Sequence, residues 1–258
     1  MQARIVPAAR GVRWLAEGWR CFRAAPLGWL TLVFAYLLLT QVMALVPLVG
    51  SAAAALLVPA FTVGLMAAAR ATSAGAKLEL GVLFDGFRHG LRGQLVLGAV
   101  YLACILLVIS LTALADDDGA VRSVLSGKRP PEELEPAQIL GPLAAFALAY
   151  APVMMMFWFA PPLSAWHGAG AAKALFFSFF ACLMNWRAFL AYGAVTAAVM
   201  LALPFVLISA VMLASSGAHK LQAGSLMIPL LLVMLPTLFA SFYASYRDVF
   251  GGTESDAV

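Results

Sequence analysis

Residues 28–69 read GWLTLVFAYLLLTQVMALVPL, then Val49 and Gly50, then SAAAALLVPAFTVGLMAAA. Each of the two runs is close to the roughly 20 apolar residues that an α-helix needs to cross the hydrocarbon core of a bilayer. Only two residues separate the runs, so the second helix returns directly alongside the first. This stretch therefore predicts a transmembrane helical hairpin, with spans at 28–48 and 51–69.

Four further apolar runs of similar length follow this hairpin. The chain of 258 residues is 64% hydrophobic and only 11% charged, whereas about 25% of the residues of soluble domains are charged. Transmembrane β-barrels show short alternating segments, which this sequence lacks. We predict an all-α polytopic membrane protein, a single integral membrane domain over 1–258, with the remaining spans at 94–114, 139–163, 188–213 and 225–246.

The distribution of lysine and arginine predicts the orientation of these spans. If the N-terminus is inside, 12 of the 16 basic residues fall in inner segments. Cytoplasmic segments of membrane proteins carry this excess, so we expect both termini in the cytoplasm. The inner basic residues are Arg4, Arg10, Arg13, Arg20, Arg23, Arg70, Lys77, Arg88, Arg92, Lys173, Arg187 and Arg247.

Two spacings recur along the chain and indicate an internal repeat. A proline inside an even-numbered span is followed 11 residues later by a basic residue, and an aromatic pair precedes each odd-numbered span. We predict three units, at about 8–70, 80–173 and 174–247, with a short cytoplasmic tail at 248–258. The spaced residues are Pro59/Arg70, Pro162/Lys173 and Pro236/Arg247, and the aromatic pairs are Trp19/Phe22, Phe84/Phe87 and Phe177/Phe180.

The segment that precedes each hairpin is predicted to be an interfacial helix. Placed on a helix, residues 83–93 put Leu83 and Phe87 on one face and Arg88 and Arg92 on the other. An aromatic face opposite a basic face is typical of a helix that lies at the membrane surface. The residues expected to contact lipid at the cytoplasmic interface are Trp19, Phe22, Arg23, Arg70, Phe84, Phe87, Arg88, Arg92, Lys173 and Arg247.

Several clusters resemble reactive sites, and each has a simpler interpretation. Asp85 and His89 could act as an acid–base pair, but nothing marks a nucleophile beside them. Asp116–Asp118 could bind a divalent cation, although a charge run beside a helix end is usually solvated. Met154–Met156 could form a copper or hydrophobic-ligand site, but consecutive residues point to different sides of a helix.

Other residue types give no sign of chemistry either. Cys21, Cys104 and Cys182 are widely spaced and are interpreted as small hydrophobes. His167 and His219 are interpreted as interfacial histidines. We therefore expect no catalytic, cofactor or metal site and no nucleic-acid partner.

The spans themselves carry small residues in place of ionisable ones. No Asp, Glu, Lys, Arg or His falls in the centre of any span, although such groups usually mark proton relays and ion coupling. Small residues at four-residue spacing let helix backbones approach closely. The predicted packing residues are Gly64, Ala68, Gly141, Ala145 and Ala149.

Three stretches carry a resemblance to known proteins: QARIVPAARGVRWLAEGWRCFRAAPLGWL, LLVPAFTVGLMAAAR and LFDGFRHG. Together they resemble an uncharacterised family of six-span bacterial inner-membrane proteins. More distantly, the chain is similar to YciC-type membrane proteins and to the membrane domain of some glycerophosphodiester phosphodiesterases. The resemblance implies an inner-membrane location and a lipid-linked setting, but it implies no active site. This chain shows no large soluble segment of the kind that a phosphodiesterase catalytic domain needs.

Two functions remain open on this sequence. The missing midplane charges favour a non-enzymatic scaffold, accessory subunit or lipid-organising protein, whose partners are the anionic cytoplasmic leaflet and another membrane protein. The internal hairpin repeat and the prolines within spans are also compatible with a transporter or flippase-like protein for a lipid or hydrophobic solute.

Overall fold

A computed structural model describes residues 2–116, 119–126, 135–214 and 223–251. These residues form helices joined by short connections, with no strand among them. The elements are α1 (Ala9–Ala24), α2 (Pro26–Ala44), α3 (Val49–Ser73), η1 (Leu80–Phe84), α4 (Asp85–Arg88), α5 (Leu91–Leu114), α6 (Ala120–Leu125), α7 (Pro136–Phe157), α8 (Ala160–His167), α9 (Ala171–Met184), α10 (Trp186–Ala214) and α11 (Ala223–Phe250).

The prediction of an all-α chain with six spans is confirmed. Within the described residues, six helical stretches are long and apolar enough to cross a membrane. They correspond to α2, α3, α5, α7 together with α8, α10 and α11. Most of the observed helices extend a few residues beyond the predicted spans. The predictions followed the apolar runs alone, whereas the helices also include polar residues that flank these runs.

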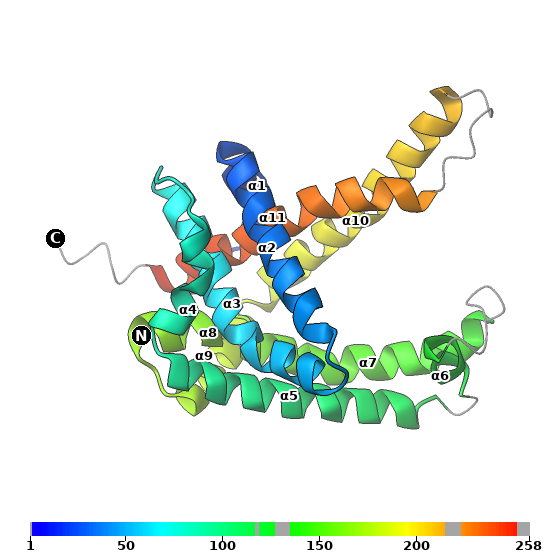
Figure 1. Cartoon of the computed structure of the whole chain (residues 1–258), viewed down its shortest axis with the longest axis horizontal. Coiled ribbons are helices and arrows are strands. Elements are labelled where there is room, and N and C mark those ends of the chain that lie inside the picture. The colour runs from blue at the N-terminus through cyan, green and yellow to red at the C-terminus, as the bar shows by residue number, and fades with distance from the viewer. Residues whose placement is uncertain (1, 117–118, 127–134, 215–222, 252–258) are drawn as a thin grey trace.

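Helices α3 and α11 form the centre of the bundle. Both are far more buried than the other four spans, and they contact each other and α2. Helix α5 packs between α3 and α7, so α5 and α7 run side by side along one edge, while α10 and α11 extend away from them (Figure 1). Most of the surface of the outer spans is left to face lipid or another protein.

Glycines allow these helices to approach within backbone contact. A Cβ atom on Gly98 of α5 would overlap the carbonyl oxygen of Leu56 in α3. The predicted packing residue Gly64 lies in the same way against the carbonyl oxygen of Leu83, and Ala68 is fully buried. Helix α3 is therefore held by close backbone contacts on more than one side.

The first segment before a hairpin, α1, packs against protein along its length. It lies against α10 and α11, and its buried residues are Gly11, Trp14, Gly18 and Phe22. Trp19, which we expected to contact lipid, is exposed, whereas Phe22 is buried. The two glycines bring α1 against the backbones of Ala188 and Thr237, so the buried face of α1 is the one that carries them.

The second such segment, residues 83–93, is not the single helix that we expected. It begins as the 3-10 helix η1, continues as the one-turn helix α4, and breaks at His89 and Gly90. Gly90 has φ +76°, a left-handed conformation that favours glycine. Because of this break, α5 starts in a new direction at Leu91.

The fourth span is interrupted between α7 and α8. Pro161 and Pro162 lie in the first turn of α8. The hydroxyl of Ser178 in α9 accepts a hydrogen bond from the Phe159 amide (2.9 Å) and donates one to the Met155 carbonyl (2.7 Å). These are the two groups that a continuous helix would pair with each other. A side chain inserted into the helical ladder is a recognised cause of a kink.

Candidate functional site

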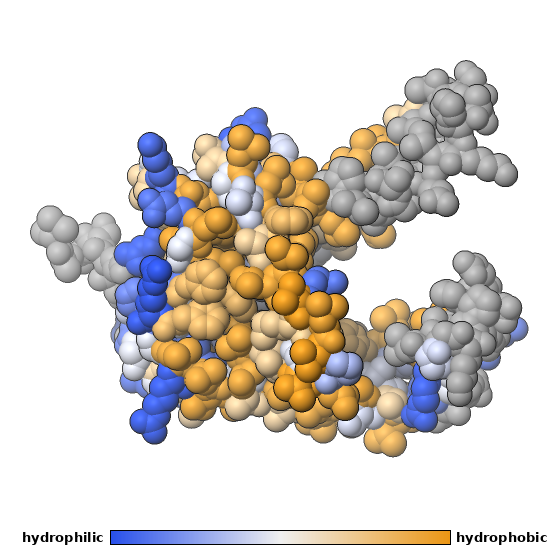
Figure 2. Space-filling view, viewed as in Figure 1, coloured by the Kyte–Doolittle hydropathy of each residue, from blue (hydrophilic) through white to orange (hydrophobic). Residues whose placement is uncertain are grey.

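Hydrophilic side chains gather at one end of the bundle, which we call the basic end. Figure 2 shows them along one edge of the molecule, where α4 and the C-terminal end of α11 lie, with apolar side chains covering most of the rest. The exposed basic residues of this end are Arg13, Arg20, Arg23, Arg70, Lys77, Arg88, Arg92, Lys173 and Arg187. The segregation matches the expected positive side of a membrane protein.

A network of ion pairs joins α1 to α11 at this end. Arg10 donates to both carboxylate oxygens of Asp248, with Nε to Oδ2 at 2.6 Å. The indole Nε1 of the fully buried Trp14 donates to the same carboxylate at 2.7 Å. The Asp248 side chain is only 12% exposed. Its hydrogen bond to Arg10 raises the pKa of that guanidinium, although burial acts in the opposite direction.

Glu17 extends this network along α1. Its carboxylate is paired with Arg10 (3.2 Å) and with Arg247 of α11, and it lies 3.9 Å from Arg20. The side chain of Glu17 is 14% exposed. A carboxylate so far removed from water requires such cations around it. We call Arg10, Trp14, Glu17, Arg247 and Asp248 the charged cluster.

A polar cavity of about 340 Å³ opens beside the charged cluster. Glu17, Arg20 and Arg247 contribute charge to its walls, and Thr72, Ser73 and Tyr243 contribute hydroxyl groups. Cys21 also lines the cavity, and burial raises the pKa of its thiol. The arrangement can hold a small polar or charged group. It shows no base aligned with a nucleophile.

The N-terminal segment is tied to the same end by Asn185. The Asn185 side chain accepts a hydrogen bond from the Val6 amide (2.8 Å) and donates one to the Arg4 carbonyl (3.0 Å). The Arg4 amide in turn donates to the Val249 carbonyl (2.9 Å). Asn185 joins α9 to α10, so three distant parts of the chain meet here.

The predicted interface residues of α1 divide between the surface and the core. Trp19 is 40% exposed and Phe22 is buried. The Arg23 guanidinium lies 5.9 Å from the centre of the Trp19 ring. Trp19 and Arg23 therefore lie together on the exposed side of α1, whereas Phe22 packs inside the bundle.

The second group of predicted interface residues packs mainly on α3. The rings of Phe84 and Phe87 lie 6.5 and 5.1 Å from that of Phe61. Arg88 and Arg92 are exposed.

Asp85 and His89 form a local ion pair (3.1 Å between Oδ1 and Nδ1) in which the His89 side chain is 60% exposed. This geometry fits the minor helix contact that we considered from the sequence.

The three basic residues at the ends of even-numbered spans have different surroundings. Arg70 lies over the ring of Trp166 (5.6 Å), and Lys173 lies over that of Phe177 (5.8 Å). Arg247 pairs with Glu17. Of the remaining predicted packing residues, Ala145 and Ala149 are half-buried, and Gly141 is exposed.

The other sequence candidates show no assembled site. Asp117, Asp118 and His219 lie outside the described residues. Within the described ranges, no group of three or more His, Cys, Asp or Glu side chains could hold a metal ion. Met154 and Met155 line an apolar cavity of about 360 Å³ with Trp158 and Trp186, which has the character of a hydrophobic site.

Sequence reasoning missed the charged cluster. Asp248 was assigned to the tail, but α11 continues to Phe250 and includes it. On a helical wheel, Arg10 and Glu17 fall on the polar face of α1, and nothing there indicates a partner in α11. One signal was present, since Glu17 is the only acidic residue among the basic residues of α1. Its partner lies 230 residues away, and no local pattern reveals such a distance.

Comparison with known proteins gives one informative match. The chain is 40% identical, over 266 aligned positions, to a probable inner membrane protein of Burkholderia thailandensis. The alignment covers the whole of this chain and 97% of the relative. No family model matches the chain, and no solved structure matches it. This similarity and the six apolar helices establish a multi-pass membrane protein, and the chain belongs to the family of that probable inner membrane protein.

Proposed function

We propose that the chain is a non-enzymatic inner-membrane protein that organises lipids or neighbouring membrane proteins as a scaffold or accessory subunit. The observation that carries this proposal is the basic end, where exposed cations surround a cluster that fixes α1 to α11. Each Lys or Arg near an anionic leaflet is worth about 1 kcal/mol. A rigid basic surface of this kind concentrates anionic lipid beneath it.

In this proposal the basic end faces the cytoplasm, and both termini lie on that side. The three hairpins act as repeated units, each introduced by an element at the cytoplasmic surface. Trp19, Arg23, Arg88, Arg92 and Lys173 are its proposed lipid contacts, since all are exposed. The lipid-linked setting that the sequence resemblance to the membrane domain of some phosphodiesterases and to YciC-type proteins implies is part of this proposal.

The proposal is tested by isolating the protein from native membranes inside polymer-bounded lipid discs. We expect enrichment of anionic lipid over the bulk membrane, together with a defined protein partner in fixed ratio. Replacing Arg88, Arg92 and Lys173 with Gln should reduce the anionic enrichment. Ser110→Ala is the control, because Ser110 is an exposed, uncharged residue of α5 outside the basic end. A lone chain with the lipid composition of the bulk membrane would contradict the proposal.

The interrupted fourth span favours the second candidate, a transporter or flippase-like protein for a lipid or hydrophobic solute. Broken helices commonly border binding sites in transporters, and an apolar cavity lies beside this break. Reconstituted vesicles with a fluorescent lipid in one leaflet would test it. Accelerated exchange between the leaflets would favour the transporter, whereas rates equal to protein-free vesicles would favour the scaffold.

A further inference from the structure

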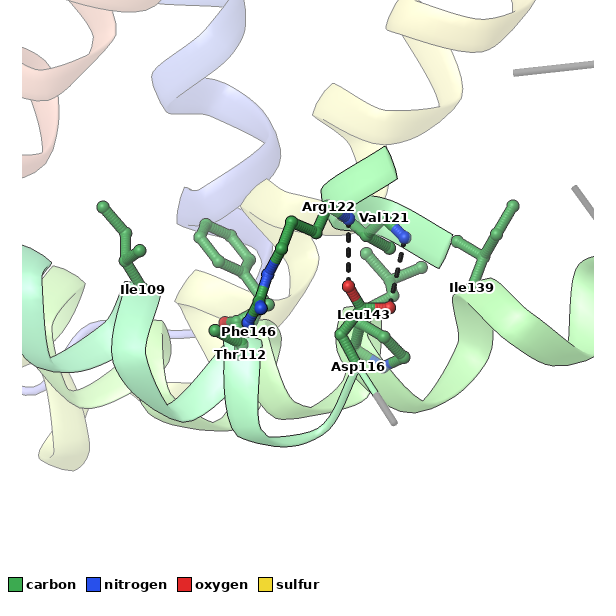
Figure 3. A pocket seen from close by; sticks show the side chains of 10 residues that line it. Ile109, Thr112, Asp116, Val121, Arg122, Ile139, Leu143 and Phe146 are labelled. Carbon is green, nitrogen blue, oxygen red and sulfur yellow. Dashed lines mark hydrogen bonds between the residues drawn. The ribbon is translucent and has the colours of Figure 1, made fainter. Parts of the chain in front are cut away.

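An apolar cavity lies at the end of the bundle opposite to the basic end. It has a volume of about 480 Å³, within the range of about 300–1,000 Å³ that ligand sites occupy. Figure 3 shows its lining side chains, which come from the last turns of α5, from α6 and from the first turns of α7. The apolar lining residues are Ile109, Ala113, Val121, Ile139, Pro142, Leu143 and Phe146.

The side chain of one basic residue, Arg122, also lines this cavity. Arg122 is exposed, and its side chain reaches toward Thr112 and Phe146 across the cavity (Figure 3). Within the described part of the chain, its guanidinium has no hydrogen-bond or ion-pair partner.

The carboxylate of Asp116, in contrast, already accepts hydrogen bonds within the protein. It accepts the backbone amides of Val121 (3.1 Å) and Arg122 (2.9 Å), which fixes the start of α6. An apolar cavity with a cation at its mouth matches a molecule with a hydrocarbon chain and an anionic group.

The connection between α5 and α7 indicates which lipid this is. Its described residues include two carboxylates, those of Asp116, which lines the cavity, and of Glu135, at the start of α7, against the single guanidinium of Arg122. This acidic excess disfavours a headgroup with net negative charge. It favours a headgroup in which an ammonium accompanies the phosphate.

We propose that this cavity binds one acyl chain of a zwitterionic aminophospholipid, with the lipid phosphate at Arg122. The apolar walls and the volume of the cavity support binding of the acyl chain. The charge balance of the connection supports the headgroup. The inference does not rest on the proposed role of the basic end, which lies at the other end of the bundle and would select anionic lipid.

The experiment uses the full chain in discs of equal phosphatidylethanolamine and phosphatidylglycerol, followed by native mass spectrometry of lipids that survive delipidation. Ala113→Trp should fill the cavity and abolish the retained phosphatidylethanolamine. Leu148→Trp is the control, because Leu148 is 78% exposed on α7 and does not line the cavity. Arg122→Gln should weaken retention by about fivefold, the value of a favourable exposed ion pair, without changing the fold.

The proposal is overturned if Ala113→Trp retains as much phosphatidylethanolamine as Leu148→Trp. It is also overturned if the lipid lost in Ala113→Trp is phosphatidylglycerol, or if the wild-type cavity retains only a compound that is not a phospholipid. Loss of phosphatidylglycerol when Arg88, Arg92 and Lys173 are replaced tests only the proposed role of the basic end. Failure of one proposal is therefore distinguishable from failure of the other.

Discussion

Asp248 accepts hydrogen bonds from two side chains of α1, those of Arg10 and of the buried Trp14. Without it, the buried indole of Trp14 loses its acceptor where water has little access, and Arg10 keeps only Glu17. The residue therefore contributes more to stability than its position near the end of the sequence indicates.

We predict that Asp248→Ala lowers the free energy of unfolding by about 1–3 kcal/mol, the cost of leaving such donors unpaired. Thermal unfolding in detergent should show a clear decrease in melting temperature. Asp85→Ala is the control, since its partner His89 is only four residues away and has a side chain that is 60% exposed, and it should have little effect. Equal decreases for the two variants would show that the cluster is not a stabilising element.

The thiol of Cys21 provides a test of the cavity beside the cluster. Burial raises its pKa, so less of the reactive thiolate is present at a given pH. In a variant with Cys104 and Cys182 replaced by Ala, maleimide should label the folded protein more slowly than the denatured protein. The rate should go on rising with pH above about pH 8.5, where an ordinary thiol levels off. A plateau near that pH would contradict the raised pKa.

At the scale of elements, the break between α7 and α8 depends on a hydroxyl from α9. Ser178→Ala leaves the Phe159 amide and the Met155 carbonyl without the partner that bridges them. We expect a loss of about 1–3 kcal/mol in the free energy of unfolding, measured as the melting temperature. Ser110→Ala is the control, because Ser110 is exposed and bonds only to Leu106 of its own helix. A similar change in both variants would count against the bridge.

The contact between α3 and α5 depends on a missing side chain. Gly98→Ala should force the two helices apart at Leu56 and cost about 1–3 kcal/mol, as other overpacked cores do. Gly193→Ala in α10 is the matched control, since its Cβ would meet nothing within 4 Å. That control should stabilise the protein by about 0.5–1 kcal/mol, because alanine is the better helix former. Thermal unfolding distinguishes the two opposite signs.

The same elements show what the sequence could and could not predict. The six spans follow from apolar length alone, and a hydrocarbon solvent leaves few alternatives for the backbone. The buried face of α1 depends on which helices meet Gly11 and Gly18, and that is a tertiary property. The break at Gly90 was likewise hidden, because a helical wheel assumes continuous helix before any contact is known. The pairing of Glu17 with Arg247 joins residues that only the assembled bundle brings together.

Over the whole molecule, charged and apolar side chains occupy separate parts of the surface. Exposed arginines and lysines lie at the basic end, and apolar side chains cover most of the remaining visible surface (Figure 2). The ion pairs of the charged cluster lie at the same end, where α11 ends. Insertion in the membrane therefore places this end, with its fixed network, on a single side.

Topology follows from this division and can be measured with reporter fusions. With the basic end inside, green fluorescent protein fused to either terminus should fluoresce, and alkaline phosphatase fused there should be inactive. Alkaline phosphatase inserted between α5 and α7 should be active, because that connection would lie in the periplasm. Replacing Arg88, Arg92 and Lys173 with Glu should weaken the orientation and raise the activity of a C-terminal phosphatase fusion. If a C-terminal phosphatase fusion to the unaltered chain were active, the predicted orientation would be wrong. The basic end could then not contact the cytoplasmic leaflet.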